Sequence, residues 1–292
     1  VVKADILIDN IDLAFEVWEK RSWSKYYSFE DFCEYILPYR IDDEPFENWR
    51  RIYCERYAPI LDSLYRGDDV VEAARVIANY LKTEGFFKHE DITTPHWGAL
   101  FLLDTRIGYC RENCDIATYV MRALGIPIAM DFYKTSPSYN SRHFWSALID
   151  TTGLAVSFNY AEEEISRQKS MSEKKKGKVY RCYYGMQPEK LDEIYVDKTI
   201  PAFFRNPLMK DVSEEYFPDD NIDILIDKNI NEDWIYLCVF TGRELIPIDI
   251  GKPHSRKVEF KNIEQKLIYF PTYCKGGHMV VAGCPFMPKH GE

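Results

Sequence analysis

The sequence lacks any long apolar run and any surplus of basic residues. No stretch of its 292 residues approaches the roughly 18 apolar residues that are needed to span a bilayer. The formal charge is −10 at pH 7, whereas proteins that bind nucleic acid in general carry basic residues to neutralise the phosphates. A membrane-spanning helix and a general nucleic-acid role are therefore both excluded.

Cysteine spacing typical of metal sites is also missing. The chain has 8 cysteines, and Cys110 and Cys114 form the one closely spaced pair. A C-x3-C pair without two further Cys or His residues at matching spacing is weak evidence for zinc. We therefore expect no metal site and no cofactor, with a metal held by Cys110 and Cys114 as an alternative. The even number of cysteines permits disulfides without requiring them.

Methionine is absent from the first position. Because the chain begins at Val1, we expect a processed product or a shortened recombinant chain, from which any signal peptide or anchor has been removed. Hydrophobic residues make up 46% of the chain and aromatic residues 15%, which argues against extended disorder. The length alone favours two globular domains.

Three regions differ in their pattern. Residues 1–90 read as a helical N-terminal region, in which Ser28 and Asp31 form a capping box before an apolar helix face. Residues 91–210 contain a helix at 110–124, strands at 126–133, 143–150 and 154–160, a tight turn at 151–153, and a polar stretch at 162–178 that we expect to be a solvated, mobile loop.

The last region, residues 211–292, consists of short apolar runs separated by turn residues. This pattern predicts a small antiparallel β-sandwich, so the fold class is α+β. The predicted strands cover residues 222–226, 234–240, 245–250, 258–260, 267–270 and 279–282.

Cys110 is the candidate nucleophile. It begins the predicted helix, where unpaired backbone N–H groups and the helix dipole favour a thiolate. Cys114 lies one turn inside the same helix, on the stripe that also contains Ala117 and Val120, and is therefore expected in the core.

A thiol nucleophile needs a base and a group that orients the base. His143 begins a predicted strand, and Asn159 lies on the next strand, where a hairpin could return it to His143. Asp150 is the alternative orienting group. It follows His143 by seven positions on one strand, which places it roughly 23 Å away at about 3.3 Å per residue, too far for a hydrogen bond.

These residues make the chain resemble the transglutaminase-like superfamily, which has the papain-like cysteine hydrolase and acyltransferase fold. The similarity rests on the G-x-C motif at 108–110, the R-A-L-G-I-P motif at 122–127 and the H-x-W motif at 143–145. It implies a transglutaminase-like core at 91–210, with Cys110 as the nucleophile and His143 as the base. The third family residue is commonly Asp in a W-V-x-x-D segment, and Asn159 stands there instead.

The resemblance also bears on Trp97. Related enzymes place an oxyanion donor upstream of the nucleophile, so the Trp97 indole N–H is a weak candidate for that role, with a place in the core as the alternative. The backbone N–H of Cys110 is the second expected oxyanion donor. His96, His254 and His278 have no carboxylate or His at metal-ligand spacing and receive no role.

The sequence thus predicts a cysteine enzyme that cleaves an amide through a thioester, with hydrolysis favoured over transfer to an amine. Protein, peptide and glycopeptide substrates all remain open, and no oligomeric state is predicted. The resemblance implies a secreted, periplasmic or cell-surface bacterial protein. The alternative is a non-catalytic envelope scaffold or binding protein that keeps the same fold.

Overall fold

The chain forms two compact units in the computed structural model. One consists of residues 1–131 and 144–170, and the other of residues 132–143 and 171–292. The structure describes residues 3–90, 95–137, 141–167, 174–187, 193–227 and 229–288. It is a mixed α/β protein with helices and antiparallel sheets. The division into three domains at 1–90, 91–210 and 211–292 stays a prediction.

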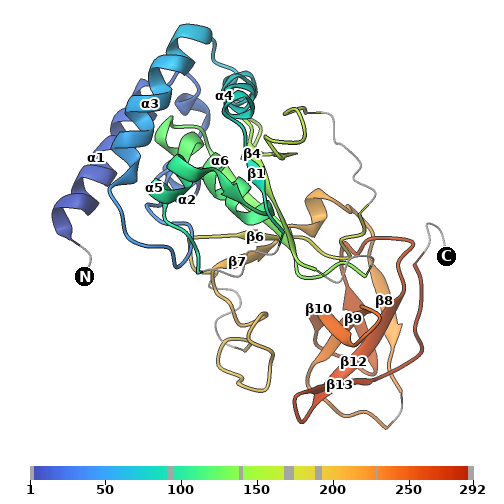
Figure 1. Cartoon of the computed structure of the whole chain (residues 1–292). Coiled ribbons are helices and arrows are strands. Elements are labelled where there is room, and N and C mark those ends of the chain that lie inside the picture. The colour runs from blue at the N-terminus through green and yellow to red at the C-terminus, as the bar shows by residue number, and fades with distance from the viewer. Residues whose placement is uncertain are drawn as a thin grey trace. The chain divides into compact units, whose positions relative to one another are not determined.

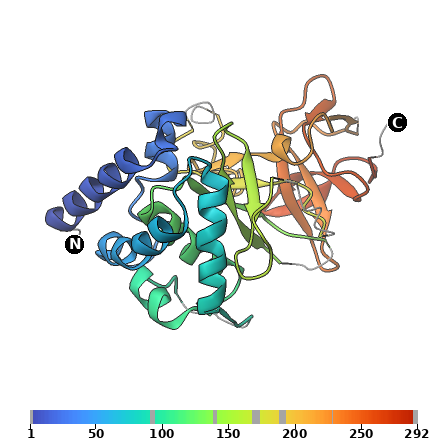
Figure 2. The same cartoon turned by 90° about the horizontal axis from the view of Figure 1, so that it is seen from above.

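The first unit contains the α-helices (Figures 1 and 2). No helix in the described part of the chain is long and apolar enough to cross a membrane. The predicted capping box at Ser28 and Asp31 is present. The α-helices are α1 (Ala4–Lys20), α2 (Phe29–Tyr35), α3 (Trp49–Leu64), α4 (Val70–Glu84), α5 (Ala99–Thr105) and α6 (Cys110–Ala123).

Helix α3 is the centre of this helical layer, because it packs against α1, α4 and α6. Two buried arginines tie the layer together. Arg50 of α3 is fully buried and donates hydrogen bonds to the carbonyl of Arg122 at 2.9 Å and to Asn10 Oδ1 at 2.8 Å. Arg122 itself donates to the carbonyl of Arg40 at 3.1 Å. The arginine of the R-A-L-G-I-P motif is therefore a structural residue that satisfies backbone carbonyls.

Helix α6 is buried almost all round, from Asn113 to Ala123. The predicted apolar stripe is confirmed, and Cys114 is 1% exposed. The helix is followed by Gly125, whose φ of 68° lies in the left-handed region. Glycine adopts this conformation easily because it has no Cβ atom to clash with the backbone. The carbonyl of Gly125 accepts a hydrogen bond from the Trp23 indole at 2.8 Å, so the end of the helix is fixed by the N-terminal region.

Three strands follow α6, namely β3 (Ile128–Tyr133), β4 (His143–Ile149) and β5 (Ala155–Phe158), and β4 lies between the other two. The predicted tight turn joins β4 to β5. Asp150 Oδ1 accepts hydrogen bonds from the Thr152 N–H at 2.8 Å and hydroxyl at 2.6 Å, and Gly153 has a φ of 82°. The first unit also contains a short parallel pair, β1 (Phe87–Lys88) and β2 (Ile107–Gly108).

The second unit contains most of the remaining strands. Two antiparallel sheets, with orders β10-β9-β12-β13 and β11-β8, contribute to one apolar core that includes Ile224, Leu237, Ile248 and Phe260. The predicted β-sandwich itself stays a prediction. The strands are β6 (Tyr180–Cys182), β7 (Met209–Asp211), β8 (Ile222–Leu225), β9 (Ile235–Phe240), β10 (Leu245–Gly251), β11 (Lys257–Phe260), β12 (Tyr269–Lys275) and β13 (His278–Val281).

Lys178 corrects the expectation of a solvated loop at 162–178. Its side chain is 2% exposed, and its ammonium contacts Asp211 Oδ2 at 2.6 Å and Asp249 Oδ2 at 3.3 Å. Burial raises the pKa of Asp249 to about 6, against the opposing effect of the Lys178 charge. The charge pattern alone could not distinguish this paired lysine from solvated ones. Residues 168–173 of that loop, like 138–140 of the loop after β3, lie outside the described residues.

Candidate active site

Cys110 is the first residue of α6, as the sequence predicts. The preceding Tyr109 is extended, and its backbone N–H donates to the Glu112 carboxylate at 2.8 Å, which closes the first turn. A Cβ at Gly108 would collide with the Cβ of Glu112. The glycine of the G-x-C motif is therefore required by the close approach of the chain to the first turn of the helix that carries the thiol.

The Cys110 thiol is half-buried and faces backbone donors. Burial raises its pKa, the backbone N–H of Phe144 and the N–H groups of Arg111 and Cys110 lower it, and the Glu112 charge raises it, so that the pKa lies above the usual value. The N–H groups act as the sequence predicts. The expected overall preference for the thiolate is nevertheless wrong, because burial outweighs them. The free thiol therefore depends on a base for its activation.

His143 begins β4 and is half-buried. Its ring lies 5.8 Å from the Tyr133 ring, centroid to centroid. His143 is the last residue of a segment that belongs to the second unit, whereas Cys110 and Asn159 belong to the first. The pairing of His143 with Cys110 therefore stays a prediction.

Asn159 directly follows β5 and organises a turn. Its side-chain carbonyl accepts the N–H of Ala161 at 3.1 Å, and its backbone carbonyl accepts the N–H groups of Glu162 and Glu163. A role for Asn159 in orienting His143 stays a prediction. The alternative, Asp150, is engaged in the β4–β5 turn and lies 3.4 Å from Arg167 Nε, so its carboxylate has a structural task there.

Trp97 is half-buried and packs against Phe101 of α5, with ring centroids 4.7 Å apart. Within the described residues its indole N–H makes no hydrogen bond. The contact with Phe101 agrees with the packing alternative, and a role as oxyanion donor stays a prediction.

Sequence reasoning missed a charged cluster around His96, to which it assigned no role. The His96 side chain is 3% exposed, and its Nε2 lies 2.7 Å from Oδ2 of Asp115, which is fully buried in α6. On the other side of the ring, Nδ1 lies 3.3 Å from Asp43 Oδ1 and 3.4 Å from Glu44 Oε2. Arg111 Nη2 is also 3.4 Å from Nδ1. The cluster therefore surrounds one imidazole with three carboxylates and one guanidinium.

The charge state of this cluster follows from its surroundings. Burial lowers the pKa of His96, but its hydrogen bond to the Asp115 carboxylate and the negative charges of Asp115 and Glu44 outweigh burial, so the pKa of His96 lies above its usual value. Burial raises the pKa of Asp115 despite the opposing effect of His96. One sequence signal could have indicated this cluster. Asp115 directly follows Cys114 on a helix that is expected to be buried, and a buried carboxylate requires a partner.

A metal centre at Cys110 and Cys114 gains no support from the described residues, in which no three His, Cys, Asp or Glu side chains are placed to hold one metal ion. All eight cysteines, including Cys110 and Cys114, are free thiols.

No family model matches this chain, and no curated protein is similar to it. Solved structures with partial similarity include a candidate cysteine protease from Cytophaga hutchinsonii, which is 14% identical with a TM-score of 0.33, over 39% of this chain and 38% of that one. Another is the periplasmic domain of TgpA from Pseudomonas aeruginosa bound to ethylmercury, which is 16% identical with a TM-score of 0.30 over 49% of each chain. The chain thus spans less than half of either structure, and at this level of similarity neither fold nor activity transfers to it.

Proposed function

We propose that this protein is a thiol-dependent amide hydrolase or acyltransferase in which Cys110 is the nucleophile, His143 the base and Asn159 the group that orients the base. The observation that carries the proposal is the half-buried thiol at the start of α6, whose pKa is lowered by the backbone N–H groups of Phe144, Arg111 and Cys110. Donors in this arrangement are suited to a sulfur anion or to the oxyanion that forms beside it.

His143 is the residue directly before Phe144 in the chain. The backbone N–H of Phe144, which lowers the pKa of the Cys110 thiol, belongs to the peptide bond between these two residues. The Cys110 thiol, with its raised pKa, requires proton removal during attack. A histidine one residue before a donor to the sulfur suits this task.

The hairpin register supports Asn159 as the orienting residue. Ser146 of β4 pairs with Phe158, the last residue of β5, and a register continued by one residue would bring Asn159 opposite Trp145. Opposite residues share a face, and Trp145 shares its face with His143 because side chains alternate along a strand.

The reaction that we propose has two halves. Cys110 Sγ forms a bond to the amide carbonyl carbon while its proton passes to His143. The C–N bond then breaks, and the amine leaves with that proton, which produces a thioester. Water attacks the thioester, and its proton passes through His143 to Sγ as the carboxylic acid departs. An amine in place of water gives acyl transfer, and we favour hydrolysis. The proposed substrates are proteins, peptides or glycopeptides outside the cytoplasm.

The test combines an activated ester with an amide. We expect p-nitrophenyl acetate to release a burst of about one equivalent of p-nitrophenol as Cys110 is acylated. Cys110→Ala should abolish the burst, and the matched variant Cys114→Ala should retain it in whatever fraction folds. Casein whose amines are blocked by reductive dimethylation should then gain new amino groups with the wild-type protein and none with Cys110→Ala. An unchanged burst or full amine release with Cys110→Ala would overturn the proposal.

A non-catalytic scaffold is the second candidate, favoured by the use of the Asn159 side-chain carbonyl in a turn. The variant Asn159→Asp distinguishes the proposed enzyme from a scaffold. Aspartate still accepts the Ala161 N–H, but in a triad it stabilises the imidazolium more strongly than asparagine does. We expect the acid limb of the pH–rate profile to move to higher pH. A scaffold would show no ester burst in either protein.

A further inference from the structure

A buried side-chain amide near the start of α6 has no hydrogen bonds. Asn113 is 2% exposed, and neither its side-chain oxygen nor its side-chain nitrogen has a hydrogen-bond partner among the described residues. The great majority of buried polar side-chain atoms in native proteins are paired, because an unpaired one has lost its contact with water and gained nothing in exchange. Asn113 is therefore an exception that requires an explanation.

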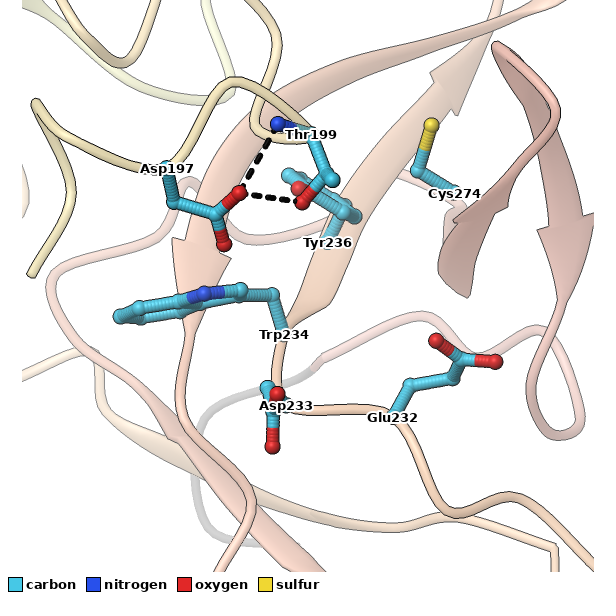
Figure 3. Close-up of a pocket in the computed structure, with 7 residues that line it drawn as sticks. All are labelled: Asp197, Thr199, Glu232, Asp233, Trp234, Tyr236 and Cys274. Atoms are coloured by element: carbon cyan, nitrogen blue, oxygen red, sulfur yellow. Dashed lines mark hydrogen bonds between the residues drawn. The ribbon is translucent and has the colours of Figure 1, made fainter.

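The usual situation is seen at a half-buried carboxylate of the second unit. One oxygen of Asp197 accepts hydrogen bonds from the Thr199 hydroxyl at 2.6 Å and from the Thr199 N–H at 2.8 Å (Figure 3). This carboxylate, which still has contact with solvent, is paired twice by the protein. The Asn113 amide has almost no contact with solvent and is not paired at all.

The position of Asn113 in the helix relates it to the candidate nucleophile. Helix α6 begins at Cys110, and Asn113 follows three positions later. Residues three apart share a helix face, with their Cβ atoms about 5–6 Å apart. Side chains on a helix also lean toward its N-terminus. The Asn113 amide therefore leans over the turn that carries the Cys110 thiol.

The other neighbours of Asn113 along α6 offer its side chain no partner. Ile116 and Ala117, three and four positions further on, are buried and apolar. The backbone carbonyl of Tyr109 already accepts the backbone N–H of Asn113 at 3.1 Å. Within α6, the Cys110 thiol is therefore the polar side chain that adjoins Asn113 along this face.

We propose that the Asn113 side-chain N–H donates a hydrogen bond to the Cys110 sulfur once that sulfur has lost its proton, so that Asn113 is a further catalytic residue. The inference rests on the proposed function, in which His143 takes up this proton. A neutral thiol is a weak acceptor, whereas hydrogen bonds to a charged acceptor are about twice as strong as neutral ones. A contact that forms only in the charged state favours the step that creates the charge.

The test is the variant Asn113→Leu, which keeps the branched shape of the side chain and removes both polar atoms. Iodoacetamide should alkylate Cys110 about three- to tenfold more slowly at about pH 7.5, because the thiolate loses a donor. The pH profile of this alkylation should also move to higher pH. The p-nitrophenyl acetate burst should become about tenfold slower or more. Peptide mapping assigns the alkylation rate to Cys110.

Thr118→Val is the matched control on the same helix. Thr118 is also 2% exposed, and its hydroxyl has no hydrogen-bond partner among the described residues. It lies eight positions beyond Cys110, about 12 Å along the helix axis. We therefore expect Thr118→Val to change the alkylation and the burst by less than about twofold. Equal slowing by both variants would show a general effect on α6 and refute the contact.

Circular dichroism confirms the fold of each variant, and Asn113→Ala replaces Asn113→Leu if leucine does not fit. A folded Asn113 variant in which Cys110 is alkylated as fast as in the wild type would overturn the proposal. Alkylation requires no acyl transfer. Slower alkylation without an ester burst in the wild type would therefore refute the proposed function and retain the contact, whereas a normal burst with unchanged alkylation would refute the contact alone.

Discussion

The thiol at the start of α6 and the imidazole packed against the next turn of the same helix have opposite surroundings. Cys110 is half-buried, and backbone N–H groups of Phe144, Arg111 and Cys110 lower the pKa of its thiol. His96 is buried, and most of the groups around its ring are carboxylates. Both have a raised pKa, but for different reasons: burial dominates at the thiol, and the carboxylates prevail over burial at the imidazole.

This difference separates a candidate chemical site from a structural one. The His96 imidazole is enclosed by partners of opposite charge, which stabilise it and leave it little freedom to act on a substrate. Cys110 is half-buried, and backbone N–H groups rather than carboxylates are its hydrogen-bond partners. A buried His beside an Asp is thus no sufficient sign of catalysis on this helix.

The largest expected effect is on stability, through His96. His96→Ala leaves the Asp115 carboxylate, which is 0% exposed, without its partner. Removal of one member of a buried charged pair typically costs about 3–5 kcal/mol. Urea unfolding followed by circular dichroism measures the loss. The matched control His89→Ala changes an exposed side chain, for which we expect a change within about 0.5 kcal/mol. Equal losses would remove the distinction between the cluster and the surface.

The second prediction concerns pH. A group whose folded pKa is raised stabilises the protein fully below its unfolded pKa, and that stability is lost as the pH rises through the folded pKa. His96 has a raised pKa, so its contribution should decline from about pH 6.5 upward. The slope for one proton is at most about 1.4 kcal/mol per pH unit.

The measurement is the free energy of unfolding of the wild type and of His96→Ala between about pH 6 and 8. The difference between the two proteins should shrink as the pH rises. A constant difference would mean that His96 is neutral throughout and that its contact with Asp115 does not depend on its charge.

Much of the fold could be predicted because it depends on local patterns. The capping box at Ser28, the start of α6 at Cys110 and the strands of the last region each follow from residues close together in the chain. The His96 cluster could not be predicted, because its members lie far apart in the chain. Asp115 is 19 positions from His96, and Glu44 accepts a hydrogen bond from the Tyr119 hydroxyl, 75 positions away. An acidic residue on a buried helix indicates that a partner exists without indicating which residue it is.

The same limit applies to the candidate site. The order of Cys110, His143 and Asn159 is a sequence motif, whereas the pKa of the thiol depends on how deeply the fold buries it. Helix position alone predicts the contribution of the N–H groups, and burial then reverses the result. Lys178 is a second example in which burial overturns the expectation from sequence. It lies in a charged run that predicts exposed side chains, yet its own side chain is 2% exposed.

The smallest expected effect tests the thiol half of the comparison through Glu112. Its carboxylate raises the pKa of Cys110 and also accepts the Tyr109 N–H at 2.8 Å. Glu112→Gln removes the charge and retains an oxygen that can accept this N–H, so the first turn should persist. The thiolate fraction at pH 8 should rise, and iodoacetamide should alkylate Cys110 about two- to threefold faster. Peptide mapping measures the rate at each cysteine.

Cys284 serves as the internal control for this measurement. It is exposed and lies in the second unit, so its alkylation rate should not change with Glu112→Gln. A Cys110 rate that stays constant while the protein remains folded would mean that the Glu112 charge does not act on the sulfur. A slower rate would mean that the carboxylate holds the first turn in a way that glutamine cannot, and that the N–H groups of this turn depend on it. Faster alkylation at Cys110 alone would show that charge and burial, rather than helix position, set the reactivity of this thiol.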